Sequence, residues 1–159
     1  MSNPGYPYAN SQIDELEAAV RALDRKMVVQ AVANEAEIEP AFAALSDRGV
    51  DALIVGGDPL FFLWREQVVA QAARHVLPTC YGWREFTTAG GLMSYGADLT
   101  EAYHQVGAYT ARILKGAKPA DLPVVQAVKV ELVLNLKTAR TLGLAFPITL
   151  LGRADEVIE

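Results

Sequence analysis

The chain has 159 residues, of which 52% are hydrophobic and 21% charged, and its 14 basic and 19 acidic residues give a formal net charge of −5. This length fits one domain or one large piece of a two-lobed protein, and the apolar content supports a packed core. The acidic balance, without a local cluster of Lys and Arg, argues against a nucleic-acid-binding protein. A lone cysteine, Cys80, excludes an internal disulfide. No apolar run is long enough to cross a bilayer, and the first residues lack the features of a secretory signal, so we expect neither.

Apolar periodicity predicts alternating helices and strands in the first third of the chain. The stripe Ile13, Leu16, Val20 and Leu23 predicts a helix that begins after Asn10 or Ser11. The elements predicted next are a strand at 27–32, a helix at about 35–47 and a buried strand at 51–55.

The middle of the chain continues this alternation. Asp58 and Pro59 predict the N-cap and first residue of a helix that ends near His75. A strand at 77–81 and a linker at 82–86 follow.

The last third carries two further cap signals. Asp98 and Glu101 form a capping box for a helix that Gly116 closes, and Asn135 caps a short helix that ends at Gly143. The other elements predicted here are a strand at 92–95, a linker at 117–127, a strand at 128–134 and a stop at Pro147.

Short apolar strands that alternate with helices predict an α/β fold, a doubly wound parallel sheet with helices on both faces. In such sheets ligands bind beyond the carboxyl ends of the strands. Unusual side chains gather in the loops expected there: Tyr6, Tyr8, Asp58, Tyr81, Trp83, Arg84 and Glu85. These loops are therefore the expected binding site.

No catalytic motif is complete. Ser94 stands in a segment that superficially matches a nucleophile elbow, but Leu92 occupies a required glycine position. His75, His104 and Cys80 have ordinary structural interpretations as helix-end, surface and buried residues. We therefore predict a binding protein rather than an enzyme, with no metal and no cofactor.

Six strings in the sequence carry a resemblance to a known family. They are Gly57-Asp-Pro-Leu-Phe-Phe62, Leu77-Pro-Thr-Cys-Tyr-Gly82, Arg84-Glu-Phe86, Gly90-Gly-Leu-Met-Ser-Tyr-Gly96, residues 113–123 and residues 131–139. In this order they resemble the ABC transporter substrate-binding proteins that include tryptophan- and tyrosine-binding relatives. The resemblance extends over essentially the whole chain.

The resemblance implies a type I periplasmic binding fold, in which two α/β lobes close on a small solute and deliver it to an ABC permease. Residues 1–159 would be one such lobe, the second, with residues 91–127 resembling the crossover to the first. A periplasmic location, an amino acid or similar ligand, and a partner lobe or homo-oligomer are implied as well.

The family's ligand contacts fall on the same loops in this sequence. They imply Tyr6, Tyr8, Asp58, Tyr81, Trp83, Arg84 and Glu85 as binding residues, with Tyr95 on a crossover completing the wall. Structural alternatives stay open: Asp58 as an N-cap only, the two N-terminal tyrosines as surface cover, and residues 83–85 as a hinge.

The resemblance also implies a gap in the sheet. The family's central strand precedes the Asn-Pro turn, and only Met1 and Ser2 stand in its place. We expect the strands at 27–32 and 51–55 either to pair directly or to have another chain between them. Three other functional classes remain as alternatives: an effector-sensing domain of a regulator, a flavodoxin-like enzyme or receiver module, and an orphan lobe with an assembly role.

Overall fold

A computed structural model of the chain describes residues 1–125 and 129–159. Within these residues one five-stranded sheet has the order β1-β2-β3-β4-β5. Its strands are β1 (Leu53–Ile54), β2 (Thr79–Tyr81), β3 (Met93–Ala97), β4 (Val130–Asn135) and β5 (Glu156–Ile158). All neighbours run parallel except β3 and β4, which are antiparallel. The predicted α/β class is confirmed, with a sheet that is mostly rather than wholly parallel.

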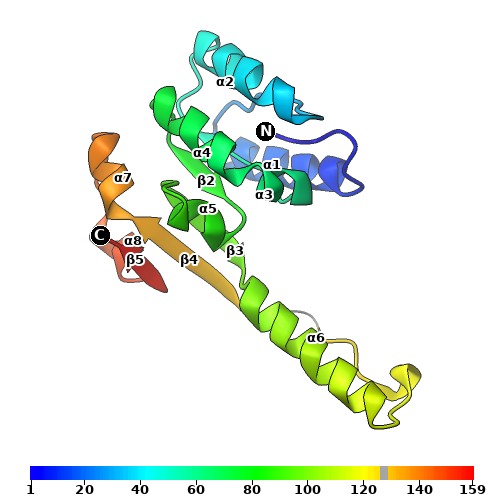
Figure 1. The fold of residues 1–159 in the computed structure, drawn as a ribbon. Coiled ribbons are helices and arrows are strands. Elements are labelled where there is room, and N and C mark those ends of the chain that lie inside the picture. The colour runs from blue at the N-terminus through cyan, green and yellow to red at the C-terminus, as the bar shows by residue number, and fades with distance from the viewer. Residues whose placement is uncertain (126–128) are drawn as a thin grey trace.

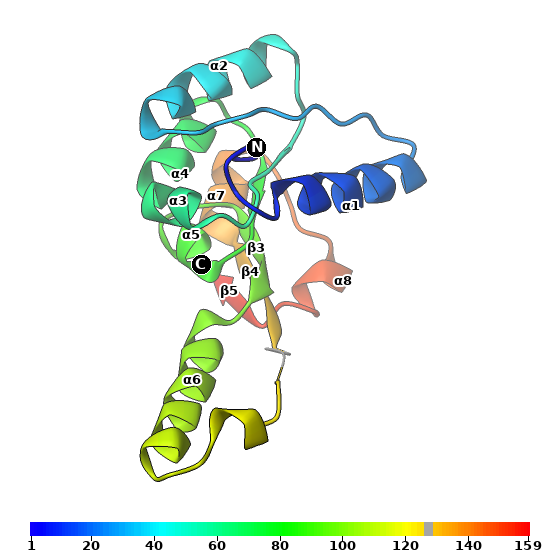
Figure 2. The same cartoon turned by 90° about the vertical axis from the view of Figure 1, so that its right-hand side faces the viewer.

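Helices cover both faces of this sheet. They are α1 (Ala9–Ala22), α2 (Ile38–Asp47), α3 (Pro59–Leu63), α4 (Arg65–Arg74), α5 (Arg84–Thr88), α6 (Leu99–Leu114), α7 (Leu136–Thr141) and α8 (Ile148–Leu151), with 3-10 turns at Glu35–Glu37 and Pro119–Asp121. Helices α2 to α5 lie on one side of the sheet, and α1 and α8 on the other (Figure 2). This is the doubly wound arrangement that the alternating pattern predicts.

The apolar core lies mainly on the side of α2 and α4. Phe42, Phe61 and Val68 are completely buried there, and Phe86 is buried beside them. Helix α1 contributes little, since Ala9 is its one buried residue. The two faces are therefore unequally packed.

Helix α6 stands apart from the rest of the molecule. It projects from the end of β3, and the chain returns into β4 (Figure 1). None of its residues is buried, although Tyr103, Val106 and Leu114 are large and apolar.

Three predicted helix caps are confirmed. The carboxylate of Asp58 accepts a hydrogen bond from Leu60 N, that of Asp98 accepts from Thr100 N and Glu101 N, and the Asn135 side chain accepts from Thr138 N. These short-range signals begin α3, α6 and α7 where the sequence predicts.

The predicted strand at 27–32 is largely wrong. Of these residues only Ala31 makes a β-bridge, and its partner is Ser2. Direct pairing between 27–32 and 51–55 is also wrong, because Met1 and Ser2 lie between them. A two-residue partner is too short to hold a longer strand in register.

Smaller differences concern element ends. The helix predicted from Pro59 to His75 divides at Trp64 into α3 and α4, and the linker at 82–86 contains the start of α5. Pro147 precedes α8, and β5 follows without having been predicted. The predicted linker 117–127 and strand 128–134 include residues 126–128, which lie outside the described residues.

Candidate ligand-binding site

The loop after Ser2 and the loop after β1 meet at the carboxyl edge of the parallel strands. The Asn3 side chain donates from Nδ2 to Asp58 Oδ2 at 3.0 Å, while its Oδ1 accepts from Gly5 N at 2.9 Å. Gln12, in the second turn of α1, donates to Gly57 O at 3.3 Å. The first tyrosine loop and the Asp58 loop therefore lie on the same side of the molecule.

Asp58 is occupied by contacts within the protein. One carboxylate oxygen accepts from Leu60 N at 2.6 Å and the other from Asn3 Nδ2 at 3.0 Å. The residue is only 3% exposed. Its geometry is that of an N-cap and a clip between two loops, and little of its surface is open to a solute.

Backbone segments meet at three glycines of this edge, and two of them, Gly96 and Gly82, approach unusually closely. A Cβ built on Gly96 would lie 1.9 Å from the carbonyl oxygen of Gly82, and one built on Gly82 would lie 3.7 Å from Gly57 Cα. Only glycine allows the first of these approaches. The end of β2 and the end of β3 are thus held in direct backbone contact.

Aromatic side chains supply the accessible surface around these loops. Tyr6 is half-buried and Tyr8 is 65% exposed, with an edge-on ring contact at 5.6 Å between centroids. Trp83 is half-buried against Phe62, and the exposed Tyr95 lies beside Gly82 through the pairing of Tyr81 with Ser94. These aromatics can stack on an apolar or aromatic solute.

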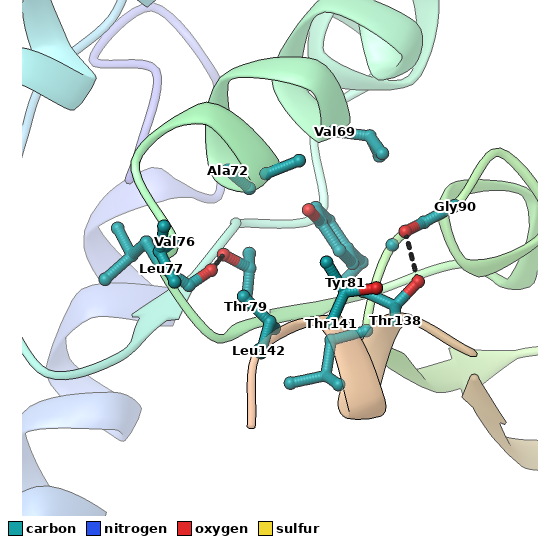
Figure 3. Close-up of a pocket in the computed structure, with 13 residues that line it drawn as sticks. Val69, Ala72, Val76, Leu77, Thr79, Tyr81, Gly90, Thr138, Thr141 and Leu142 are labelled. Atoms are coloured by element: carbon teal, nitrogen blue, oxygen red, sulfur yellow. Dashed lines mark hydrogen bonds between the residues drawn. The ribbon is translucent and has the colours of Figure 1, made fainter. Parts of the chain in front are cut away.

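Tyr81 lies in the interior. It is 1% exposed and stacks on Phe86 at 4.7 Å between ring centroids. Its side chain faces a cavity of about 70 Å³ between α4 and α7, which Thr79 also lines (Figure 3). Burial raises the pKa of the Tyr81 phenol. The structure places this residue in the core and away from the loop surface.

Arg84 is held by two carboxylates. Its guanidinium donates to Glu131 at 3.1 Å and to Glu156, and so connects the start of α5 to β4 and β5. Burial raises the pKa of Glu131, against the opposing effect of the Arg84 charge. The neighbouring Glu85 has a buried oxygen, Oε2, without a hydrogen-bond partner among the described residues.

Seven of the eight predicted site residues therefore divide into two groups, and the eighth, the half-buried Glu85, belongs to neither. The aromatic rings of Tyr6, Tyr8, Trp83 and Tyr95 remain accessible, whereas Asp58, Tyr81 and Arg84 hold the frame behind them. Sequence reasoning missed three contributors: Asn3, Gln12 and Glu131. The Asn-Pro-Gly turn is a signal for Asn3, because Asn commonly bonds the backbone two residues on.

The described part of the chain holds neither a metal-binding cluster nor a membrane-spanning helix. Residues 1–125 and 129–159 hold no group of three or more His, Cys, Asp or Glu side chains placed to bind a metal ion. Among the same residues, no helix combines the length and hydropathy needed to span a membrane.

Comparison with solved structures gives close likeness in fold. A conserved domain protein from Vibrio cholerae O1 biovar eltor is 26% identical with a TM-score of 0.87, and the match covers 98% of this chain and 52% of that one. An ABC domain from Streptococcus pneumonia in complex with L-Trp is 27% identical with a TM-score of 0.87, covering 99% and 54%. A ligand-free, open substrate binding protein with adhesive properties from Clostridium difficile shares the fold at 20% identity and a TM-score of 0.69, covering 99% and 52%.

The chain thus spans about half the length of these solved relatives. No curated protein matched it by sequence. The profile of one family, described as ABC transporter substrate binding protein, matches residues 1–158. The resemblance expected from the six sequence strings is confirmed, and the chain belongs to the ABC transporter substrate binding protein family.

Proposed function

We propose that this protein is one lobe of a solute-binding component of an ABC importer and that its ligand is an amino acid with an aromatic or branched side chain. The observation that carries the proposal is the group of accessible aromatics at the carboxyl edge of the sheet. The L-Trp bound by the Streptococcus relative is a ligand of matching chemistry.

The geometry of the edge favours binding between two surfaces. Tyr8 and Tyr95 are 65% and 63% exposed, so this lobe alone encloses little of a solute. Small-molecule sites usually bury most of the ligand surface. The second surface would come from the half of the relatives' length that this chain does not span, or from a second copy of the chain.

Closure of the two surfaces around the solute would be the conformational change that accompanies binding. A solute that contacts both lobes stabilises the closed arrangement over the open one, which is a population shift without any bond made or broken. An ABC permease would then receive the solute, and this role implies a periplasmic location. Neither role requires catalysis.

Thermal-shift assays and calorimetric titrations with L-Trp, L-Tyr and L-Leu test the ligand class. L-Asp, whose side chain is charged rather than apolar, serves as the control. A ligand that binds the native state raises the Tm, and the effect grows with its concentration. For the isolated lobe we expect a Kd weaker than about 1 μM, because one surface makes only part of the contacts. Absence of any shift with the apolar amino acids at millimolar concentration would refute the proposal.

Tyr8→Ala provides the matched test of the site. Tyr8 and Tyr103 are both surface tyrosines, 65% and 73% exposed, but Tyr103 lies on α6. We expect Tyr8→Ala to weaken binding by about tenfold, in keeping with a stacking contact of about 1 kcal/mol or slightly more. Tyr103→Ala should leave binding unchanged, and equal effects of the two substitutions would remove Tyr8 from the site.

A further inference from the structure

The cavity between α4 and α7 is separate from the candidate ligand-binding site. Leu77 and Leu92 line it and come just before β2 and β3, so the cavity lies toward the amino ends of these parallel strands. The accessible aromatics of the candidate site lie at the opposite, carboxyl edge. The proposed solute-binding function therefore makes no use of this cavity.

One side chain that faces the cavity has unused hydrogen-bonding capacity. Tyr81 is 1% exposed, and its phenol oxygen has no hydrogen-bond partner among the described residues. The side chain extends from β2 toward α4 and lines the cavity (Figure 3). Buried tyrosine hydroxyls normally have a partner, so an unpaired one that faces a cavity points to a ligand that bonds it.

Two threonines restrict the hydrogen bonds that a ligand can make in this cavity, which they also line. Thr79 Oγ1 donates to Leu77 O at 2.9 Å. Thr138 Oγ1 donates to Gly90 O at 2.8 Å. Each threonine hydroxyl has thereby used its hydrogen, and its oxygen can only accept from a further partner, whereas the Tyr81 hydroxyl can still donate. A ligand that fits accepts one hydrogen bond and donates another, which is the pattern of a hydroxyl group.

The remaining walls and the volume set the size of the ligand. Val69, Ala72, Leu77 and Leu92 make these walls apolar. The volume is about 70 Å³. Because a cavity of about 150 Å³ takes the six carbon atoms of benzene, about three non-hydrogen atoms fit here. A hydroxyl group on a short alkyl chain matches both the polar and the apolar parts of the lining.

The cavity reaches the surface between the end of α4 and α7. Val76 and Thr141 line it, and both are exposed. Val76 also has a φ of 51°, which a β-branched residue rarely adopts, at the position after α4 where glycine is favoured. A side chain is thus kept at the entrance despite backbone strain, a kind of strain that is common beside ligand sites.

We propose that this cavity is a second binding site and that its ligand is a short-chain alcohol of about three non-hydrogen atoms. The ligand hydroxyl accepts a hydrogen bond from Tyr81 and donates one to Thr79 or Thr138. The alkyl group packs on Val69 and Ala72 of α4. Binding is reversible, since no covalent bond is made or broken.

An NMR titration with ethanol, with tert-butanol as the larger alcohol, tests the site. We expect ethanol to give saturable amide shifts around the cavity, at Leu77, Leu92 and Thr138, with a Kd of about 10 mM, because so small a ligand makes few contacts. tert-Butanol has five non-hydrogen atoms and should bind at least about tenfold more weakly. Non-specific effects of alcohols grow with their apolar area. Shifts that do not saturate, or that are larger with tert-butanol, would overturn the proposal.

Three variants test the contacts of the ligand. Tyr81→Phe removes only the unpaired hydroxyl and keeps the ring on Phe86, so it should fold and bind ethanol about fivefold more weakly. Ala72→Val narrows the cavity and should weaken ethanol binding without removing a polar group. Tyr103→Phe, on the exposed face of α6, is the control and should leave ethanol binding unchanged. An unchanged Kd in Tyr81→Phe would show that the phenol does not bond the ligand and would overturn the proposal.

Water is the competing occupant of this cavity. Magnetic relaxation dispersion detects long-lived buried water, and a signal that is lost in Tyr81→Phe, together with no saturable ethanol shift, would show that the cavity binds water only. That result would overturn the proposal. No amino acid is used in these experiments, so their outcome is independent of the proposed solute-binding function.

Discussion

Replacement of Asp58 distinguishes a structural clip from a ligand contact. Asp58→Ala removes the cap on Leu60 N, which costs about 1 kcal/mol. It also leaves the buried Asn3 amide without its acceptor, at a cost of roughly 1–3 kcal/mol. The sum, about 3 kcal/mol, corresponds to a fall in Tm of roughly 6–12 °C for a chain of this size.

Urea unfolding followed by circular dichroism measures this loss, and two further variants interpret it. Asp98→Ala removes a cap from the outlying helix α6 and should cost about 1 kcal/mol or less. In a double-mutant cycle, Asn3→Ala with Asp58→Ala should cost less than the sum of the single substitutions by about 1 kcal/mol. If Asp58→Ala proves as mild as Asp98→Ala and yet abolishes solute binding, the carboxylate is a ligand group and the clip interpretation is wrong.

Three further predictions concern the glycines and the buried carboxylate. Gly96→Ala places a methyl group against the Gly82 carbonyl and should lower the free energy of unfolding by several kcal/mol or prevent folding. Gly107→Ala, which has open space around it in α6, should raise the free energy of unfolding by up to about 1 kcal/mol. Chemical denaturation measures both changes, and similar effects at the two positions would contradict the backbone contact between Gly96 and Gly82. Because the pKa of Glu131 in the folded chain is raised above the ordinary value of 4.5, the folded chain keeps a proton there that the unfolded chain releases. Stability therefore falls as the pH rises from about 4.5 through the pKa of the folded chain. Glu131→Gln, which can still accept from Arg84, should flatten this part of the pH–stability profile, and an unchanged slope would show that another group causes it.

Local signals were the most reliable part of the sequence interpretation. Asp58, Asp98 and Asn135 each cap a helix as predicted, because a cap depends only on the two or three residues that follow it. Strand direction is different, since it depends on how the chain returns over a long distance. The antiparallel pairing of β3 with β4 was therefore not predicted, and neither was the three-residue β5.

The sequence predicted where the candidate site lies better than it predicted what each of its residues does. The loops at the carboxyl edge do meet, as the hydrogen bond from Asn3 to Asp58 requires. The roles of individual residues depend on partners remote in sequence: Arg84 bonds Glu131 and Glu156, which lie 47 and 72 residues away. Tyr81 ends a strand of only three residues, too few for alternation to tell which face its side chain takes.

The route of the chain through α6 has a consequence for engineering this lobe. The excursion leaves at Ala97 and returns at Val130, and these two residues are directly paired in the antiparallel ladder. An Asn-Gly turn could therefore close β3 onto β4 as an ordinary hairpin. Because α6 buries none of its residues, such a shortened chain would keep the whole sheet. It would lose a protruding arm whose exposed tyrosine and leucine side chains favour aggregation at high concentration.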